Sequence, residues 1–167
     1  MERMTQLITH LKLQPHPEGG YYAETYRSKE IIPQAVLPGR FAGERNFSTA
    51  IYFLIPAGQF SAFHRIQADE LWHFYEGQPL HVYVIHPQGN MEFIRLGNNV
   101  AMGETFQAMV PAGCWFASEP ATANGYCLVG CTVAPGFDFT DFELAQREIL
   151  EEYYPEHKDF IRQLTRG

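Results

Sequence analysis

Apolar and polar residues alternate in short stretches through the middle of this chain, which is the pattern of β-strands with one buried face. Turn-forming groups such as Pro-Ala-Gly, Gln-Gly-Asn and Ala-Asn-Gly separate the stretches. The pattern predicts strands at 21–28, 48–55, 60–66, 70–77, 80–87, 91–97, 105–111, 114–120 and 126–135. Strands of this length at a spacing of about ten residues are typical of an antiparallel sandwich or closed barrel.

Helical spacing replaces this alternation at both ends of the chain. A short helix is predicted within residues 4–13 from the spacing of its apolar residues, Leu7, Ile8 and Leu11. Thr140 and Glu143 fit a capping box and predict a helix that begins there, and Pro155 suits the first turn of a second one. We therefore expect a single domain over residues 1–167, with a barrel over about 20–136 and a helical tail over about 140–166.

Composition narrows the class of protein and its partners. The 167 residues are 46% apolar and 14% aromatic, which is enough for one domain with a packed core. The net charge of −7 argues against a nucleic-acid backbone or an anionic membrane as partner, because both require clustered Lys and Arg. No apolar run approaches the roughly 20 residues of a membrane-spanning helix, and the first residues lack the apolar segment of a secretory signal. We therefore expect a cytoplasmic protein that binds neither nucleic acid nor membranes.

The three cysteines, Cys114, Cys127 and Cys131, are expected to be buried free thiols. Cys127 and Cys131 lie on one predicted strand, roughly 13 Å apart, whereas a disulfide needs Cα atoms within about 7 Å. The segment HPEGG at 16–20 ends the first helix and is predicted to be a turn, because it lacks the spacing of a phosphate-binding loop.

The stretch GQFSAFHRIQADELWHFYEG, residues 58–77, carries the candidate chemistry. The two-residue period of a strand places His64 on the same face of its strand as Ala62 and Ile66. On the next strand it places Glu70 and Trp72 together on one face. The short turn between the two strands predicts antiparallel neighbours, with His64 beside Glu70 in the interior. Such a pair can move a proton or orient the imidazole as a base, and it can equally be a hydrogen-bonded pair of the core without chemistry.

The same stretch resembles a known family motif. The spacing Gly58-x5-His64-x5-Glu70-x6-Gly77 is similar to the first motif of the cupin superfamily, and Pro111-Ala-Gly113 is similar to part of the second. The blocks HPEGGYYAETYRS, DELWHFYEG, VPAGCWFAS and VGCTVAPGFDFTDFELA resemble the cupin family DUF985, or cupin type 5, over residues 14–155. This resemblance implies an all-β fold, a double-stranded β-helix or jelly roll, with the ligand site inside the barrel. The flanking patterns add a short N-terminal helix and C-terminal helices.

The chain departs from the metal-binding members of the superfamily. Ile66 and Phe116 stand where these members have two of their histidine ligands. A catalytic metal usually has three protein ligands, and His64 with Glu70 supplies two, so we expect no cofactor. The alternative is a divalent transition metal held by His64, Glu70 and His73, which requires a bulge to redirect His73, or by His81 of the next strand.

Three functions stay open at this point. The resemblance to metal-free cupins, epimerases of nucleotide-linked deoxysugars, implies a metal-independent isomerase or epimerase with His64 as base. Glu70 is expected to orient this base because it neighbours His64, and the few Arg and Lys in the predicted strands favour a small polar or carbohydrate-like substrate. The others are a non-catalytic ligand-binding cupin and a metal-dependent cupin enzyme. Further ligand contacts are expected from Tyr22, Glu24, Tyr26, Trp72 and Phe116. The run that holds Tyr22, Glu24 and Tyr26 on one face is either a polar pocket wall or a solvated sheet face. The resemblance also implies a homodimer.

Overall fold

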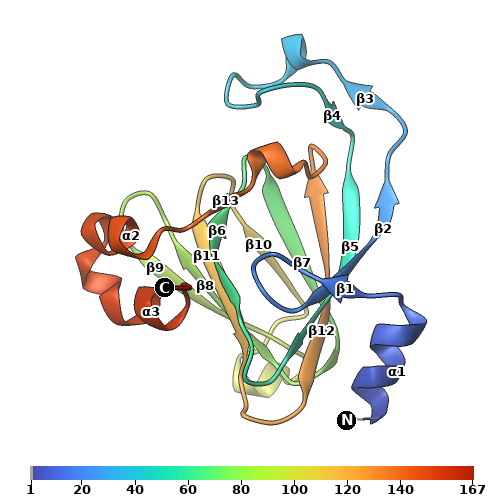
Figure 1. Cartoon of the computed structure of the whole chain (residues 1–167), viewed down its shortest axis with the longest axis vertical. Helices are drawn as coiled ribbons and strands as arrows, with labels where there is room; N and C mark the ends of the chain where they lie inside the picture. Colours follow the sequence, from blue (N-terminus) through green and yellow to red (C-terminus); the bar gives the residue numbers. More distant parts are fainter. Residues whose placement is uncertain (1) are drawn as a thin grey trace.

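The computed structural model describes residues 2–167, which form two large antiparallel sheets packed face to face and a separate two-stranded sheet (Figure 1). The first sheet has six strands in the order β1-β2-β5-β12-β7-β10. Their bounds are β1 Gln14–Pro15, β2 Tyr21–Arg27, β5 Thr49–Pro56, β7 Asp69–Gly77, β10 Gln107–Val110 and β12 Tyr126–Ala134.

The second sheet has five strands in the order β13-β6-β11-β8-β9. Their bounds are β6 Ser61–Arg65, β8 Leu80–Ile85, β9 Met91–Leu96, β11 Trp115–Pro120 and β13 Glu143–Leu144. Nine strands were predicted from the alternation, and each has its counterpart here, so the all-β prediction is confirmed.

The main core lies between the two sheets because alternate side chains of the central strands point inward. Along β12, residues Cys127, Val129, Cys131 and Val133 are all at most 5% exposed. The first three meet Trp72 from β7 and the inward side chains of the opposite sheet. As predicted, the three cysteines are buried free thiols.

One prediction about strand pairing is wrong. The strands at 60–66 and 70–77 were expected to be antiparallel neighbours, but β6 belongs to the five-stranded sheet and β7 to the six-stranded sheet. The segment between them therefore crosses from one sheet to the other. Strand β6 pairs instead with β11 and β13, and β7 pairs with β10 and β12.

The helices lie on the outer faces of the sheets. Helix α1, Glu2–His10, packs Leu7 against Leu54 and Leu128 of the six-stranded sheet. Helices α2, Arg147–Tyr153, and α3, Lys158–Gln163, cover the five-stranded sheet (Figure 1). The short 3-10 helices are η1 Gln34–Val36, η2 Val100–Met102, η3 Phe139–Asp141 and η4 Pro155–His157.

The start of the helical tail also differs from the prediction. Thr140 and Glu143 form no capping box, because Asp138 accepts the Thr140 N–H in front of η3 and Glu143 begins β13. Pairing with β6 makes residues 143–144 part of the barrel, so the tail becomes helical only at Arg147. None of the helices within residues 2–167 is long and apolar enough to cross a membrane.

Residues 28–48 form an arm that stands off from the barrel in Figure 1 and carries β3, Ile31–Ile32, and β4, Arg45–Asn46. A buried ion pair ties the arm to the barrel, with Nη2 of Arg45 2.6 Å from Oδ1 of Asp141. Phe41 is 2% exposed and packs near the segment that joins β6 to β7.

Candidate functional site

A cavity of about 300 Å³ lies inside the barrel. Both sheets contribute to its wall, as does the loop between β1 and β2. The polar side chains of the wall include two histidines, three glutamates, an arginine and a threonine: His16, His64, Glu18, Glu24, Glu70, Arg27 and Thr49. Aromatic and aliphatic side chains surround them, so polar contacts inside the cavity are shielded from bulk water.

His64 comes from β6 and is 4% exposed. Its Nδ1–H donates to the carbonyl oxygen of Ala62 at 2.7 Å, and this bond assigns the proton of the neutral ring to Nδ1. The unprotonated Nε2 then faces Oε1 of Glu18 at 3.6 Å. Phe116 and Phe142 hold the ring in place, with ring centroids 4.1 and 5.3 Å away.

Glu18 is the carboxylate beside His64, and it lies in the turn formed by the HPEGG segment. Its side chain accepts a hydrogen bond from Oγ of Ser61 at 3.2 Å on Oε1. Nδ1 of His16 lies 2.9 Å from Oε2. Gly19 permits this turn because its φ is +115° and a Cβ there would overlap the carbonyl oxygen of Phe60.

These contacts set the charge of the pair. Burial opposes ionisation of Glu18, but the positive charge that His64 and His16 can carry, together with the hydrogen bond from Ser61, outweighs burial and lowers the pKa of Glu18. Burial also lowers the pKa of His64, although the Glu18 carboxylate partly opposes this effect. At neutral pH the site therefore holds an ionised Glu18 beside a neutral imidazole.

Glu70 enters the same cavity from β7, in the opposite sheet from His64. Burial raises the pKa of Glu70 to about 8, and the negative charge of Glu18 adds to the increase. Glu70 is therefore protonated at neutral pH and can donate a proton. The buried indole N–H of Trp72 lies near this carboxyl group but makes no hydrogen bond of acceptable geometry within residues 2–167.

The prediction of a His64–Glu70 pair needs correction in its geometry. Both side chains line the cavity as expected, but the carboxylate within ion-pair distance of His64 is Glu18. The reason is topological, because β6 and β7 lie in facing sheets and not side by side.

The other predicted contacts divide into three groups. Tyr22, Glu24 and Trp72 line the cavity. Phe116 is 1% exposed and packs in the core against the His64 ring. Tyr26 is 53% exposed, because a β-bulge between Glu24 and Tyr26 breaks the two-residue period and turns its side chain outward.

The residues of the cavity do not fit a transition-metal site. Ile66 lines the cavity and Phe116 lies against His64, so hydrocarbon occupies both positions of the missing ligands. His73 stays on the opposite face of β7, where its Nε2 lies 2.9 Å from Oγ1 of Thr132. His81 packs on Phe93 at the outer side of the five-stranded sheet. Among the residues that the structure describes, no three His, Cys, Asp or Glu side chains group closely enough to hold a metal ion.

Sequence reasoning missed His16 and Glu18, which it placed in a simple turn. The signal available was the block HPEGG itself, in which a histidine and a carboxylate two residues apart precede an aromatic strand. Only the packing of this turn against β6 gives the two residues their role.

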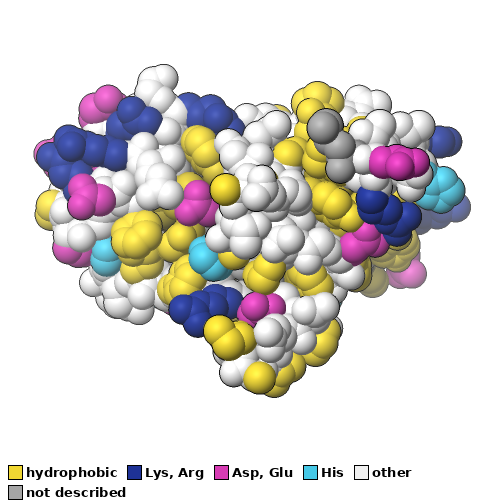
Figure 2. Space-filling model, turned by 90° about the horizontal axis from the view of Figure 1, so that it is seen from below, with side chains coloured by type: hydrophobic (Ala, Val, Ile, Leu, Met, Phe, Trp, Pro, Cys, Tyr) yellow, Lys and Arg dark blue, Asp and Glu magenta, His cyan; other side chains and the backbone are white. Residues whose placement is uncertain are grey.

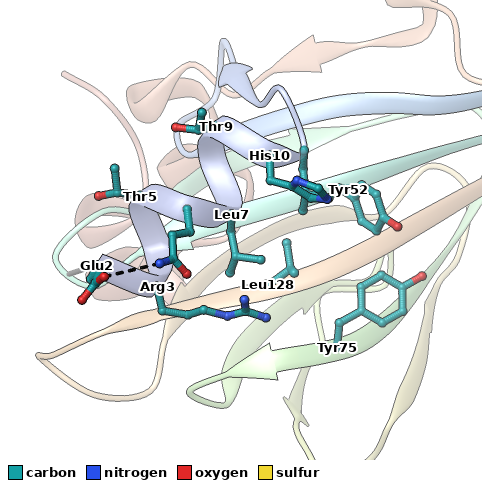
Figure 3. Close-up of a pocket in the computed structure, with 11 residues that line it drawn as sticks. Glu2, Arg3, Thr5, Leu7, Thr9, His10, Tyr52, Tyr75 and Leu128 are labelled. Carbon is teal, nitrogen blue, oxygen red and sulfur yellow. Dashed lines mark hydrogen bonds between the residues drawn. The ribbon is translucent and has the colours of Figure 1, made fainter.

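A second, larger hollow of about 1330 Å³ lies outside the barrel, between α1 and the outer face of the six-stranded sheet (Figure 3). In this view Leu7 points toward Leu128 of β12, and Tyr52 and Tyr75 extend from the strands on either side of it, β5 and β7. Figure 2 looks at the molecule from this end, where acidic, basic and apolar side chains lie interspersed on the surface. We place the candidate site in the barrel because the buried titratable side chains gather there.

Comparison with known proteins agrees with this architecture. A family model described as the cupin superfamily, DUF985, matches residues 5–145. The chain belongs to this DUF985 family of the cupin superfamily.

Relatives of this DUF985 protein are found in bacteria and eukaryotes. It is 42% identical to protein SO0799 from Shewanella oneidensis, with a TM-score of 0.86 and coverage of 97% of this chain and 96% of the other. A hypothetical protein from Leishmania major is 35% identical, with a TM-score of 0.88 and coverage of 98% of both chains. The uncharacterized protein YML079W of Saccharomyces cerevisiae is 32% identical over a 155-residue alignment that covers 87% of this chain and 76% of the yeast protein.

Proposed function

We propose that this cupin is a metal-independent acid–base enzyme of the isomerase or epimerase type, acting on a small uncharged polar molecule bound in the barrel. His64 serves as the base, Glu18 as the carboxylate that stabilises its imidazolium, and Glu70 as the acid. One observation carries the proposal: two carboxyl groups share a cavity, and their surroundings push their pKa values in opposite directions.

The base step rests on the tautomer of His64. With its proton on Nδ1, the ring presents the Nε2 lone pair toward the cavity, where it can remove a proton from a carbon next to a carbonyl group. The imidazolium that forms is stabilised by the ionised Glu18, whose Oε1 lies 3.6 Å from Nε2. When His64 takes up the substrate proton, its new positive charge therefore forms an ion pair with the negative charge that Glu18 already carries.

The acid step rests on Glu70. A carboxyl group with a pKa of about 8 is mostly protonated at neutral pH, so it can donate its proton to the carbonyl oxygen or to the carbanion. His64 and Glu70 come from facing sheets, so a bound molecule lies between groups that differ in protonation. Removal and return of a proton from different groups is what an epimerisation or a keto–enol isomerisation requires.

The cavity favours a small ligand without negative charge. Its volume of about 300 Å³ is at the lower end for ligand sites, which disfavours a nucleotide-linked sugar. Glu18 already supplies one negative charge. The guanidinium of Arg27 already pairs with Glu24 at 2.6 Å and donates to Asn46 at 2.8 Å, so it is not free to bind an anionic group. The indole of Trp72 offers a flat surface for the apolar face of a sugar ring, so we expect a carbohydrate-like substrate.

The test begins with thermal shift against free sugars, sugar phosphates, nucleotide sugars and small organic acids. We expect free sugars or similar neutral molecules to stabilise the protein and their phosphorylated forms to do so less. The stabilisation should disappear in His64→Gln and remain in His10→Gln, which removes an exposed histidine of α1. Stabilisation that persists in His64→Gln would overturn the assignment of the site.

Incorporation of solvent deuterium into the bound molecule then separates an enzyme from a binding protein. We expect proton NMR in D₂O to show exchange at one carbon of the ligand. Binding without exchange would refute the enzyme proposal and favour a non-catalytic ligand-binding cupin. Stoichiometric Fe, Mn, Ni or Zn in protein purified without chelator would replace it with a metal-dependent enzyme.

We further propose that the protein is a homodimer that pairs through the outer face of the six-stranded sheet. Leu71, Tyr75 and Met109 are 40 to 52% exposed on this face. The positions among them are His73, Gln107 and Thr132, without Asp, Glu, Lys or Arg. A second copy with the same net charge of −7 can approach most easily where its partner carries no charge.

Light scattering tests this assembly. We expect twice the 19.1 kDa of one chain for the wild type and a single-chain mass for a Leu71→Glu/Met109→Glu variant. A wild type that is monomeric at high concentration would overturn the homodimer and leave the face to another partner.

A further inference from the structure

We propose that Arg166 is a positioning residue, which holds the Glu18 turn against β6 so that the carboxylate reaches His64. The catalytic meaning of this role rests on the proposed function, but the contact itself is independent of any substrate. It connects the C-terminal tail to a residue 148 positions earlier in the chain.

The guanidinium of Arg166 joins the two backbone segments that meet at the site. Its Nη2 donates to the carbonyl oxygen of Glu18 at 2.9 Å and to that of Phe60 at 3.2 Å. Its central carbon also lies 4.5 Å from the centre of the Phe60 ring. We call these contacts of Arg166 with Glu18 and Phe60 the clamp. Gly19 leaves room for it, since a Cβ there would lie 2.5 Å from the same Nη2 atom.

Other hydrogen bonds also shape the turn: the N–H of His16 donates to the carbonyl oxygen of Gly20 at 2.9 Å, and the N–H of Gly19 donates to that of His16 at 3.1 Å. Strand β1, which precedes it, pairs with β2 over only two residues. Besides Arg166, the Glu18 carbonyl oxygen accepts the N–H of Ala62 at 2.9 Å. Ala62 is also the residue whose carbonyl oxygen accepts Nδ1–H of His64. The backbone contacts of Glu18 and the tautomer of His64 therefore depend on the same short segment of β6.

Arg166 reaches the turn from a rigid support. Arg147 of α2 donates from Nε to Oγ1 of Thr165 at 2.8 Å and from Nη2 to the Thr165 carbonyl oxygen at 2.5 Å. The carbonyl oxygen of Leu164 accepts the N–H of Phe63, the residue before His64. Leu164 is fully buried and Thr165 is 3% exposed. The tail after α3 is thus built into the barrel, and Arg166 is its outward-facing end.

Loss of the clamp should change the pKa of His64. The titratable groups that act on this imidazole are Glu18 and His16, which both belong to the clamped turn. Glu18 raises the pKa of His64 against the effect of burial. Glu18 acts on His64 more strongly than His16 does, and Phe116 and Phe142 still cover the ring. If the turn moves away, the pKa of His64 therefore falls, and the imidazolium formed in the base step loses its counter-charge.

The test compares Arg166→Ala with Arg162→Ala. Arg162 is an exposed arginine of the same tail and pairs with Glu151, remote from the turn. NMR titration of the His64 imidazole should show a pKa about 0.5 to 1 unit lower in Arg166→Ala, a part of the 1 to 3 units that a close opposite charge contributes. Arg162→Ala should titrate like the wild type, and Arg166→Lys should recover part of the shift. The Tm of Arg166→Ala should stay near that of the wild type, because substitution of an exposed side chain usually changes stability little. A shift of the His64 pKa without a change in Tm then reports on position and not on stability.

Glu18→Gln serves as the reference for complete loss of the carboxylate. If it lowers the pKa of His64 while Arg166→Ala does not, Arg166 has no positioning role and the inference is overturned. This result would leave the proposed function intact. Conversely, a shifted His64 in a protein that exchanges no substrate proton would support the clamp and refute the enzyme.

Discussion

Glu18 and Glu70 share one cavity, yet the protein treats them differently. Glu18 sits in a turn and is surrounded by partners, namely Ser61, His16 and His64. Glu70 sits on a strand among core side chains and faces the charge of Glu18. Both are less than 10% exposed, so burial alone cannot explain why one pKa is lowered and the other raised.

The difference lies in the charges that face each carboxyl group. The imidazoles of His64 and His16 and the hydroxyl of Ser61 stabilise the charged form of Glu18, whereas burial dominates at Glu70. The second ionisation is also opposed by the first, because like charges in a low-dielectric cavity repel each other. The turn thereby creates the base side of the site, and the strand creates its acid side.

Removing the charge of the turn should have the largest effect. We expect Glu18→Gln to lower the rate of deuterium exchange into a bound substrate by about 100-fold or more, because the imidazolium loses its counter-ion. The control is Glu143→Gln, which removes a carboxylate that pairs with Arg65 at the surface. An exchange rate in Glu18→Gln equal to that of the control would show that the turn plays no part in the chemistry.

Removing the acid of the strand should change the pH dependence of stability. Folded Glu70 keeps its proton up to about pH 8, whereas an unfolded glutamate loses it near pH 4.5. Unfolding therefore releases a proton between these values, so the stability that Glu70 contributes is complete below pH 4.5 and is lost as the pH rises toward 8. We expect Glu70→Gln to flatten this decline and to be more stable than the wild type at pH 8.5 by a few kcal/mol, since each pKa unit corresponds to about 1.4 kcal/mol.

Urea unfolding at pH 4.5, 6, 7 and 8.5 measures this effect. Parallel pH curves for wild type and variant would mean that Glu70 is ionised in the folded protein. In that case Glu70 cannot serve as the acid, and the difference in protonation between Glu18 and Glu70 is refuted.

A smaller effect is expected from Phe116, which packs against the His64 ring but makes no contact with a ligand. Phe116 packs on the imidazole from within the core, so Phe116→Leu should lower the free energy of unfolding by about 1 to 2 kcal/mol. The ligand Kd should change little, because Phe116 belongs to the core and not to the cavity wall. A large loss of affinity without loss of stability would restore Phe116 as a ligand contact.

The smallest effect is expected from the tyrosines of β2. Tyr22 lines the cavity with its ring 4.5 Å from that of His16, and Tyr26 faces solvent beyond the bulge. Removing a hydroxyl that contacts ligand is worth about 0.5 to 1.5 kcal/mol, so Tyr22→Phe should weaken binding a few-fold. Tyr26→Phe should leave the Kd unchanged in the same titration calorimetry, and equal effects of both substitutions would contradict the bulge.

The sequence by itself determined the fold class, the strands and the burial of the cysteines. These features follow from local alternation and turn residues, which are readable along the chain because a strand exposes every second side chain. It also determined that His64 and Glu70 face the interior, since both lie in phase with apolar neighbours such as Ala62 and Trp72.

The tertiary structure alone decided which carboxylate meets His64. Glu18 lies 46 positions earlier in the chain than its imidazole partner, in a turn whose place depends on Gly19, β6 and Arg166. The bulge that turns Tyr26 outward and the crossing of β6 and β7 into separate sheets likewise leave no local pattern. Contacts between distant segments are set by the packing of the whole barrel, so the chemistry of the site emerged only from its three-dimensional structure.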